Sequence, residues 1–367
     1  MSRRKILCIV GTRPEAIKMA PVILALQQEP WAQVRVLATA QHRFILDQVL
    51  NFFNIIPDID LDIMRPNQTL TTLTARMLFK FDEVLQGEKP DVVLAQGDTT
   101  TVMTSALACF YHRIPFGHVE AGLRTWDMHN PFPEEANRVI TGRLARWHFA
   151  PTESSRQNLL REGTSDRDII VTGNTVIDAL LMTAAKELAI GIPLDPSKRL
   201  VLVTSHRREN FGEPFRNICR ALKTLAERNP EIQILYPVHP NPNVKLVAHE
   251  MLSGCSNIIL CEPLDYAPFI AAMKSAYLII SDSGGVQEEA PALGKPVLVL
   301  REETERPEAV EIGVVKLVGP NYERIVAETQ RLLDDAVAYR TMARGVSPYG
   351  DGKAAERIVA VLRGCCP

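Results

Sequence analysis

The chain has 367 residues, 46% of them hydrophobic and 23% charged, and its 41 basic and 43 acidic side chains leave a net charge of −2. A chain of this length and composition is expected to fold as a globular protein with two domains, each with its own core. The near-neutral charge excludes a general electrostatic attraction to nucleic acids or anionic membranes, so neither is expected as a partner.

The cysteines and the first residues of the chain indicate the compartment. The seven cysteines form no Cys-x-x-Cys pair, which favours a reducing compartment and no structural zinc. Basic residues precede the apolar run 6–10, but this run is too short for a signal peptide and is better interpreted as a first buried strand. No apolar run approaches the roughly 20 residues that span a bilayer. We therefore expect a cytoplasmic protein.

Short runs rich in Val, Ile and Leu alternate with amphipathic segments along the whole chain. This alternation is typical of parallel sheets with crossover helices, so the predicted fold class is α/β, with two doubly wound Rossmann-like domains facing a cleft. The predicted strands lie near 5–10, 33–39, 91–96, 115–119, 147–150, 168–172, 199–205, 232–238, 257–261, 277–281, 296–300 and 314–318.

A break in this pattern at 190–196, rich in Gly and Pro, separates the two halves. We expect an N-terminal domain of residues 1–172 and a C-terminal domain of residues 173–352. The last predicted helix, about 353–367, follows a loop long enough to let it pack back on the first domain. Ligands of open α/β sheets bind beyond the carboxyl ends of the strands, so polar residues at those ends are the candidates for a site.

Two cations follow the first predicted strand. Arg13 and Lys18 lie at the start of a helix in which Pro14 suits the first turn. Both could bind a phosphate, although basic residues near helix starts are also common on protein surfaces.

Three carboxylates of the first half lie at the ends of predicted strands or at the start of a predicted helix. Asp98, after strand 91–96, is either a helix N-cap or a site carboxylate. Glu120 ends the next strand, where a structural carboxylate has little reason to be. Glu134 and Arg138 are four residues apart on one helix face and form either a surface ion pair or part of the site. Together, the three carboxylates are expected to converge at one sheet edge, with cations nearby.

In the second half, His206 and two arginines follow the strand 199–205. A histidine among cations suits a phosphate better than a metal ion. His239 is interpreted as structural, and no His-x-His or His-Glu-x-x-His spacing supports a metal site, so no bound metal is expected.

The turn Ser283, Gly284 and Gly285 joins an apolar strand to a helix and so presents free backbone N–H groups to an anion. Glu289 lies one helical turn beyond Gly285 and could accept hydrogen bonds from ribose hydroxyls. Arg306, in a charged loop beside this turn, is a candidate partner for the same nucleotide. An ordinary strand-to-helix turn is the alternative interpretation.

In chain order, these segments closely resemble one family, the non-hydrolysing UDP-N-acetylglucosamine 2-epimerases. The resemblance covers residues 5 to about 357 and implies the two-domain fold of the GT-B-type glycosyltransferases. The matching segments are GTRPEAIK (11–18), TAQHR (39–43), QGDTTT (96–101), HVEAGLR (118–124), PFPEEANR (131–138), SHRRENFG (205–212), SDSGGVQEEAP (281–291) and REETERPE (301–308).

The resemblance also implies roles for individual residues. The catalytic positions of the family fall on Asp98, Glu120, Glu134, Arg138 and His206. Its UDP-binding positions fall on Arg13, Lys18, Phe269, Ser283, Gly284, Gly285, Glu289 and Arg306. Bacterial members are often activated by UDP-N-acetylglucosamine at a second site, of which Gln41 and His42 keep part. Phe44 and Asn67 depart from the polar or basic contacts of some relatives, so weak or altered regulation is expected.

The implied activity is the reversible epimerisation of UDP-N-acetylglucosamine at C2, through loss of UDP, a 2-acetamidoglucal and re-addition. Such an enzyme supplies N-acetylmannosamine precursors for bacterial surface polysaccharide. The expected ligands are UDP-N-acetylglucosamine and UDP, the expected assembly is a homodimer, and no cofactor is expected. The absence of Gly-x-Gly-x-x-Gly after the first strand agrees with a reaction without nicotinamide.

Three alternatives stay open. A retaining glycosyltransferase of the same fold would use the same nucleotide-binding turn, but transfer generally needs one base, and three carboxylates favour the epimerase. A hydrolysing 2-epimerase would release UDP and free N-acetylmannosamine. A catalytically inactive sensor of nucleotide sugars would have no need to keep the full set of charged residues.

Overall fold

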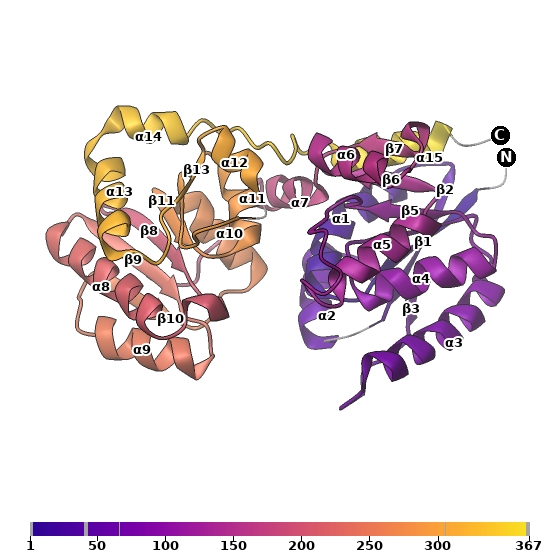
Figure 1. Ribbon diagram of the computed structural model, residues 1–367, viewed down its shortest axis with the longest axis horizontal. Coiled ribbons are helices and arrows are strands. Elements are labelled where there is room, and N and C mark those ends of the chain that lie inside the picture. The colour runs from indigo at the N-terminus through magenta and orange to yellow at the C-terminus, as the bar shows by residue number, and fades with distance from the viewer. Residues whose placement is uncertain (1–2, 40–42, 66, 305, 365–367) are drawn as a thin grey trace. The chain divides into compact units, whose positions relative to one another are not determined.

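The computed structural model of the protein describes residues 3–39, 43–65, 67–304 and 306–364 (Figure 1). The chain forms two compact units. The first unit comprises Met1–Ala179 and Tyr349–Pro367, and the second comprises Leu180–Pro348. Within the described residues, no helix is both long enough and apolar enough to cross a membrane.

The first unit is built on a seven-stranded parallel sheet with the strand order β3-β2-β1-β4-β5-β6-β7. Its strands are β1 (Arg4–Val10), β2 (Ala32–Ala38), β3 (Ile59–Asp60), β4 (Val92–Gln96), β5 (Phe116–Val119), β6 (Trp147–Ala150) and β7 (Ile169–Val171). The helices of this unit are α1 (Arg13–Gln27), α2 (Arg43–Phe52), α3 (Leu70–Glu88), α4 (Thr100–Tyr111), α5 (Glu134–Leu144), α6 (Glu153–Arg161) and α15 (Ala354–Gly364), and the boundary between the units falls within α7 (Thr175–Ala184).

The second unit has a six-stranded parallel sheet with the order β10-β9-β8-β11-β12-β13. Its strands are β8 (Arg199–Thr204), β9 (Ile232–Pro237), β10 (Ile258–Cys261), β11 (Leu278–Ser281), β12 (Val297–Val299) and β13 (Val315–Leu317). Its helices are α8 (Glu213–Arg228), α9 (Pro242–Leu252), α10 (Tyr266–Ser275), α11 (Gly284–Ala292), α12 (Pro307–Glu311), α13 (Tyr322–Asp334) and α14 (Ala336–Met342).

The predicted fold class is confirmed, since both units are doubly wound parallel sheets. Each of the twelve predicted strands is present, with ends that differ by at most one residue. The strand β3 was not predicted, because two residues beside a longer neighbour carry no periodic signal of their own.

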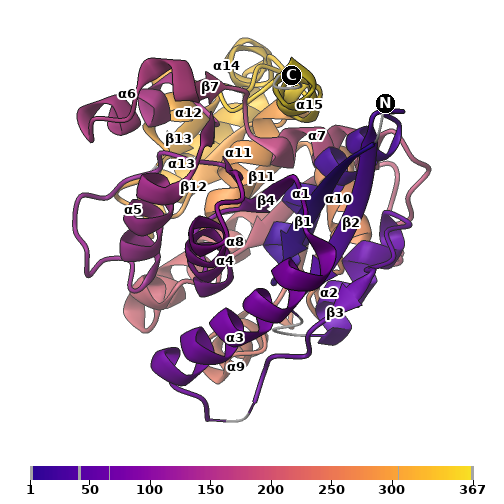
Figure 2. The same cartoon turned by 90° about the vertical axis from the view of Figure 1, so that its right-hand side faces the viewer.

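Each sheet is covered by helices that bury apolar side chains. In the first unit, α3 and α4 lie side by side (Figure 1 and Figure 2) and enclose a core with residues of β1, β4 and β5, including Leu7, Val93 and Phe116. The C-terminal helix α15 belongs to this unit, where Leu362 O accepts a hydrogen bond from Arg4 Nη1 at 3.0 Å. In the second unit, α8, α9 and α13 enclose the corresponding core.

Candidate functional site

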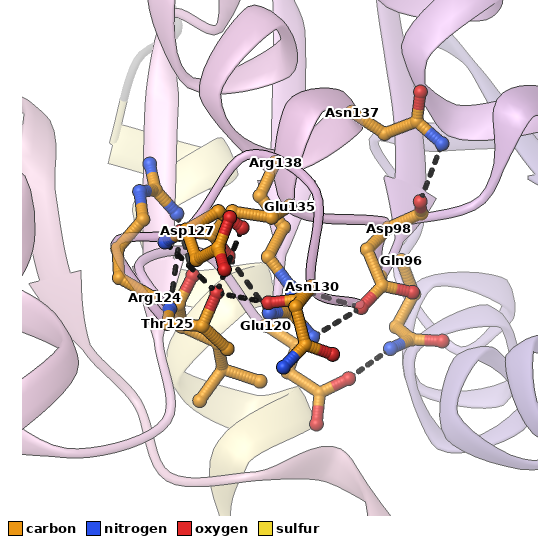
Figure 3. Close-up of polar contacts among 12 residues, drawn as sticks. Gln96, Asp98, Glu120, Arg124, Thr125, Asp127, Asn130, Glu135, Asn137 and Arg138 are labelled. Carbon is orange, nitrogen blue, oxygen red and sulfur yellow. Dashed lines mark hydrogen bonds and ion pairs between the residues drawn. The ribbon is translucent and has the colours of Figure 1, made fainter. Parts of the chain in front are cut away.

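Two carboxylates of the first unit lie just beyond neighbouring strands, β4 and β5 (Figure 3). The register of these parallel strands places Gln96 opposite Val119, so the residues that follow each strand emerge at the same edge of the sheet. Asp98 and Glu120 are therefore brought together, as the sequence predicts.

The Glu120 carboxylate is buried and surrounded by donors. Its two oxygens lie 2.6 and 2.7 Å from Lys18 Nζ, and one of them accepts a hydrogen bond from Asn174 Nδ2 at 2.8 Å. The Gln96 side-chain amide donates to the other. The Glu120 backbone has a φ of 63°, a left-handed conformation that costs free energy for a residue with a Cβ and that concentrates at functional sites. These contacts hold the carboxylate in one orientation.

Arg138 holds the Asp98 carboxylate. Its Nε and Nη2 lie 3.0 and 2.8 Å from Asp98 Oδ2, while its Nη1 lies 3.0 Å from Glu135 Oε2. Burial disfavours the charge of Arg138, but Asp98 and Glu135 outweigh this effect and raise the pKa of the guanidinium. The N-cap of α4 is Thr99, so the capping interpretation of Asp98 is wrong. The interpretation of Glu134 and Arg138 as a surface ion pair is also wrong, since Arg138 pairs with Asp98 and Glu135.

Glu134 is the first residue of α5 and is partly buried. In the described part of the chain, neither the Glu134 carboxylate nor the Arg13 guanidinium makes a hydrogen bond or an ion pair. Both side chains can therefore bind a ligand without first breaking an internal contact.

Three residues that sequence reasoning did not assign support these groups. Gln96 and Asn174 bind Glu120, as described above. The Glu135 carboxylate accepts hydrogen bonds from the backbone N–H groups of Thr125 and Trp126, both at 3.0 Å, and so ties the loop before α5 to that helix (Figure 3). Signals for all three were present in the sequence. Gln96 ends a predicted strand, Asn174 follows the predicted strand 168–172, and Glu135 lies in the segment PFPEEANR.

Glu15 joins the loop after β1 to the loop that carries Asp98. Its Oε2 accepts hydrogen bonds from the N–H groups of Gly11 and Thr12, and its Oε1 accepts one from Thr99 Oγ1 at 2.6 Å. Burial raises the pKa of Glu15 to about 7, against the lowering effect of these hydrogen bonds.

We expect Glu15 to make the free energy of unfolding depend on pH. The pKa in the folded protein lies above the ordinary value of 4.5, so the folded state binds this proton more tightly, and the stabilisation is lost as the pH rises through about 7. Glu15→Gln removes the titration. The free energy of unfolding of the wild type minus that of the variant should fall by about 2 to 3 kcal/mol between about pH 5 and pH 8. Urea unfolding at the two pH values measures it, and a constant difference would contradict the expectation.

In the second unit, the turn after β11 begins α11, with Ser283 at the N-cap. The Ser283 hydroxyl makes no capping bond, so the first N–H groups of the helix are available to an anion. A Cβ at Gly284 would lie 2.7 Å from Arg306 Nη1, whereas one at Gly285 would meet only the distant oxygens of Ser283 and Glu289, at 3.8 and 3.9 Å. The guanidinium of Arg306 therefore occupies the space that a side chain at position 284 would fill, and the space beside Gly285 is open.

Arg306 is held at this turn by Glu288, whose Oε1 accepts a hydrogen bond from its Nε. Glu289 is buried on the same helix. Phe269 lies on α10 and is partly buried. The candidate regulatory residues Gln41 and His42 lie outside the described residues.

His206 follows β8, and its Nδ1 lies 3.2 Å from Asp282 Oδ1. Its ring stacks on that of His239, with centroids 5.7 Å apart and an angle of 19° between the ring planes. His239, interpreted from the sequence as structural, is exposed beside this candidate site residue. No group of three His, Cys, Asp or Glu residues in the described ranges is arranged to hold a metal ion.

Comparisons with known proteins agree on one family. A family model described as UDP-N-acetylglucosamine 2-epimerase matches residues 24–363. The UDP-N-acetylglucosamine 2-epimerase of Escherichia coli O157:H7 is 55% identical over 369 residues, which cover 98% of each chain. The crystal structure of the UDP-GlcNAc 2-epimerase from Neisseria meningitidis bound to UDP-GlcNAc is similar with a TM-score of 0.88 and 48% identity, covering 98% of this chain and 100% of that one. The Methanocaldococcus jannaschii UDP-GlcNAc 2-epimerase in complex with UDP-GlcNAc and UDP has a TM-score of 0.78 and 36% identity, covering 98% and 99% of the two chains.

Proposed function

Because this chain belongs to the UDP-N-acetylglucosamine 2-epimerase family, we propose that it interconverts UDP-N-acetylglucosamine and UDP-N-acetylmannosamine by inverting C2, without releasing free sugar. The observation that carries the proposal is the cluster in the first unit. Asp98 and Glu120 lie at the ends of adjacent strands, and each is paired with a cation. Two such carboxylates are suited to moving a proton.

The reaction is an elimination followed by an addition. The C2 proton of the sugar is not acidic, so its removal must accompany departure of the group on C1. A carboxylate takes the C2 proton, the C–H electrons form the C1=C2 double bond, and UDP leaves C1 with the electron pair of the C1–O bond. UDP then adds back to C1 of the 2-acetamidoglucal while a proton is delivered to the opposite face of C2. The sum involves no oxidation, so no redox cofactor is needed.

The first unit supplies proton transfer in this proposal. Asp98 and Glu120 are oriented by Arg138 and Lys18, and a carboxylate must be ionised to accept a proton. Glu134, which makes no hydrogen bond or ion pair in the described part of the chain, is available to complete proton transfer with a bound sugar. The resemblance makes Lys18 a UDP-binding residue. Its ammonium group has three N–H donors and donates to both carboxylate oxygens of Glu120.

The second unit supplies the leaving-group site. The N–H groups at the start of α11, with Arg306 and His206, bind the diphosphate and stabilise the charge that it gains when the C1–O bond breaks. The family resemblance makes Arg13 a further cation for UDP, and Glu289 accepts hydrogen bonds from the ribose. The same proposal includes a homodimer in the cytoplasm, which rests on the family resemblance alone.

Proton NMR of UDP-N-acetylglucosamine incubated with the protein in deuterated water tests the function. Deuterium at C2 of both UDP-linked epimers is the expected result, because the proton removed at C2 exchanges with solvent before it is replaced. Free N-acetylmannosamine with UDP would instead identify a hydrolysing enzyme. Unlabelled substrate without a second epimer would contradict epimerisation and favour glycosyl transfer to an acceptor.

A further inference from the structure

Asp282 has no part in the mechanism above, yet it is a fully buried carboxylate at the end of β11. The residue before it, Ser281, pairs with Thr204 of β8, so Asp282 lies beside the segment that carries His206. Its Oδ2 atom accepts four hydrogen bonds, and such bonds are stronger when the acceptor is ionised. The donors are Ser205 Oγ at 2.9 Å, the backbone N–H groups of His206 at 2.9 Å and Arg207 at 3.0 Å, and Asn210 Nδ2 at 3.1 Å.

The other oxygen of this carboxylate, Oδ1, has a different environment. It is buried, and no donor in the described part of the chain makes an aligned hydrogen bond to it. His206 Nδ1 lies 3.2 Å away, within ion-pair distance. A buried acceptor without a donor costs about 1 to 3 kcal/mol, and the His206 side chain is 44% exposed, so it can turn to align its N–H. Hydrogen bonds of catalytic groups often tighten in this way when substrate binds.

The ring of His239 stacks on that of His206. His239 Nδ1 accepts a hydrogen bond from the backbone N–H of Asn241 at 3.1 Å, which leaves Nε2 to carry the hydrogen of the neutral ring. Burial and the nearby His206 lower the pKa of His239. A neutral ring can stack on a protonated His206 without repulsion between like charges.

We infer that Asp282 is a positioning residue, which fixes a hydrogen on His206 Nδ1 and thereby makes Nε2 the atom that carries a proton to the diphosphate. With Nδ1–H bound to the carboxylate, protonation at Nε2 places the positive charge of the ring between Asp282 and the leaving group. The imidazolium then donates Nε2–H to the diphosphate oxygen as the C1–O bond breaks. The inference depends on the proposed function only for the identity of this anion.

Nitrogen-15 NMR of the histidine rings tests the inference on the wild-type protein, without substrate. The His206 signals are assigned by their loss in His206→Gln. At a pH where the ring is neutral, Nδ1 should show the pyrrole-type shift of a protonated nitrogen and Nε2 the pyridine-type shift. The opposite pattern would overturn the inference even if Asp282 variants failed to fold.

Asp282→Asn gives the second test. The four donors on Oδ2 select the amide oxygen of asparagine for that position, so the NH2 group takes the place of Oδ1 and faces His206. Nδ1 must then become an acceptor, and its shift should move from pyrrole-type to pyridine-type. The value of kcat for epimerisation should fall on the order of 10²-fold, with a change in KM below about 3-fold, because the lost charge acts mainly as the leaving group departs.

A double-mutant cycle separates this role from a general effect on the fold. In a His206→Gln background, Asp282→Asn should change kcat by less than about 2-fold, since its effect passes through the ring. An additive loss would overturn the inference. Asp178→Asn is the matched control, because Asp178 is also a buried carboxylate that accepts backbone N–H groups, those of Ala354 and Ala355. It should lower stability and leave kcat and the His206 shifts unchanged. If epimerisation is absent altogether, the ring shifts still decide the question.

Discussion

Replacing Glu120 with glutamine should lower kcat for epimerisation by about 10³-fold or more, the largest effect of any single substitution that we predict. An amide can neither accept the C2 proton nor return it. The Lys18 ammonium, which the two carboxylate oxygens bind at 2.6 and 2.7 Å, would also lose its counter-charge. Initial rates and the rate of deuterium incorporation at C2 measure the effect, and both should fall together if Glu120 takes part in proton transfer.

The loss of a buried ion pair could reduce activity through the fold alone, because breaking such a pair costs about 3 kcal/mol or more. Glu162→Gln controls for this effect. Glu162 binds Arg124 Nε and Nη2 at 2.7 and 2.8 Å in the same unit, and the Arg124 side chain is only 1% exposed. This variant should lose stability comparably but keep turnover. Similar rates for the two variants would assign Glu120 to the fold and not to the chemistry.

Acidification should unfold the first unit through two buried histidines. His118 and His148 are register partners on β5 and β6, and burial lowers their pKa values to about 3 and about 4. Both rings are therefore neutral in the folded protein, while in the unfolded chain they titrate near the ordinary value of 6.5. Their contribution to stability is complete above pH 6.5 and is lost as the pH falls toward these lowered values. Together, the two histidines should lower the free energy of unfolding by about 6 kcal/mol at about pH 4, which is comparable with the whole stability of many domains.

His118→Gln tests this expectation. His118 Nε2 lies 2.7 Å from Gly97 O and donates to it, a bond that a glutamine amide could replace, and the buried Nδ1 has no partner among the described residues. The free energy of unfolding of the wild type minus that of the variant should fall by about 3 kcal/mol between about pH 6.5 and pH 4. His249→Gln is the control, because His249 is exposed and its ring is solvated in both states. An unchanged difference for His118→Gln would show that another group governs acid unfolding.

The strands were predictable because their signal is local. A buried parallel strand is a short apolar run, and twelve such runs correspond to twelve of the thirteen strands found in the described ranges. The start of α1 was also predictable, since Pro14 suits the first turn of a helix. The structure adds a capping box formed by Thr12 and Glu15. The strand β3 was missed because its two residues pair only through their neighbour β2.

Part of the candidate site was also visible in the sequence. Asp98 and Glu120 follow apolar strands, and the parallel order of those strands places their ends at one edge. The turn at Ser283 was recognisable from its glycines. The reason for Gly284 was not, because the group that needs the space is the guanidinium of Arg306, 22 residues later in the chain.

The sequence by itself determined which residues end the strands and which family the chain resembles, because both depend on short segments of neighbouring residues. Only the tertiary structure decided which groups pair. Glu120 binds Lys18 across 102 residues, and Asp282 binds the backbone N–H of His206 across 76. Arg138 pairs with Asp98 and Glu135, and not with Glu134, which lies four residues before it on α5. Partner choice depends on the direction of each side chain and on contacts between distant segments, and neither is specified by local periodicity.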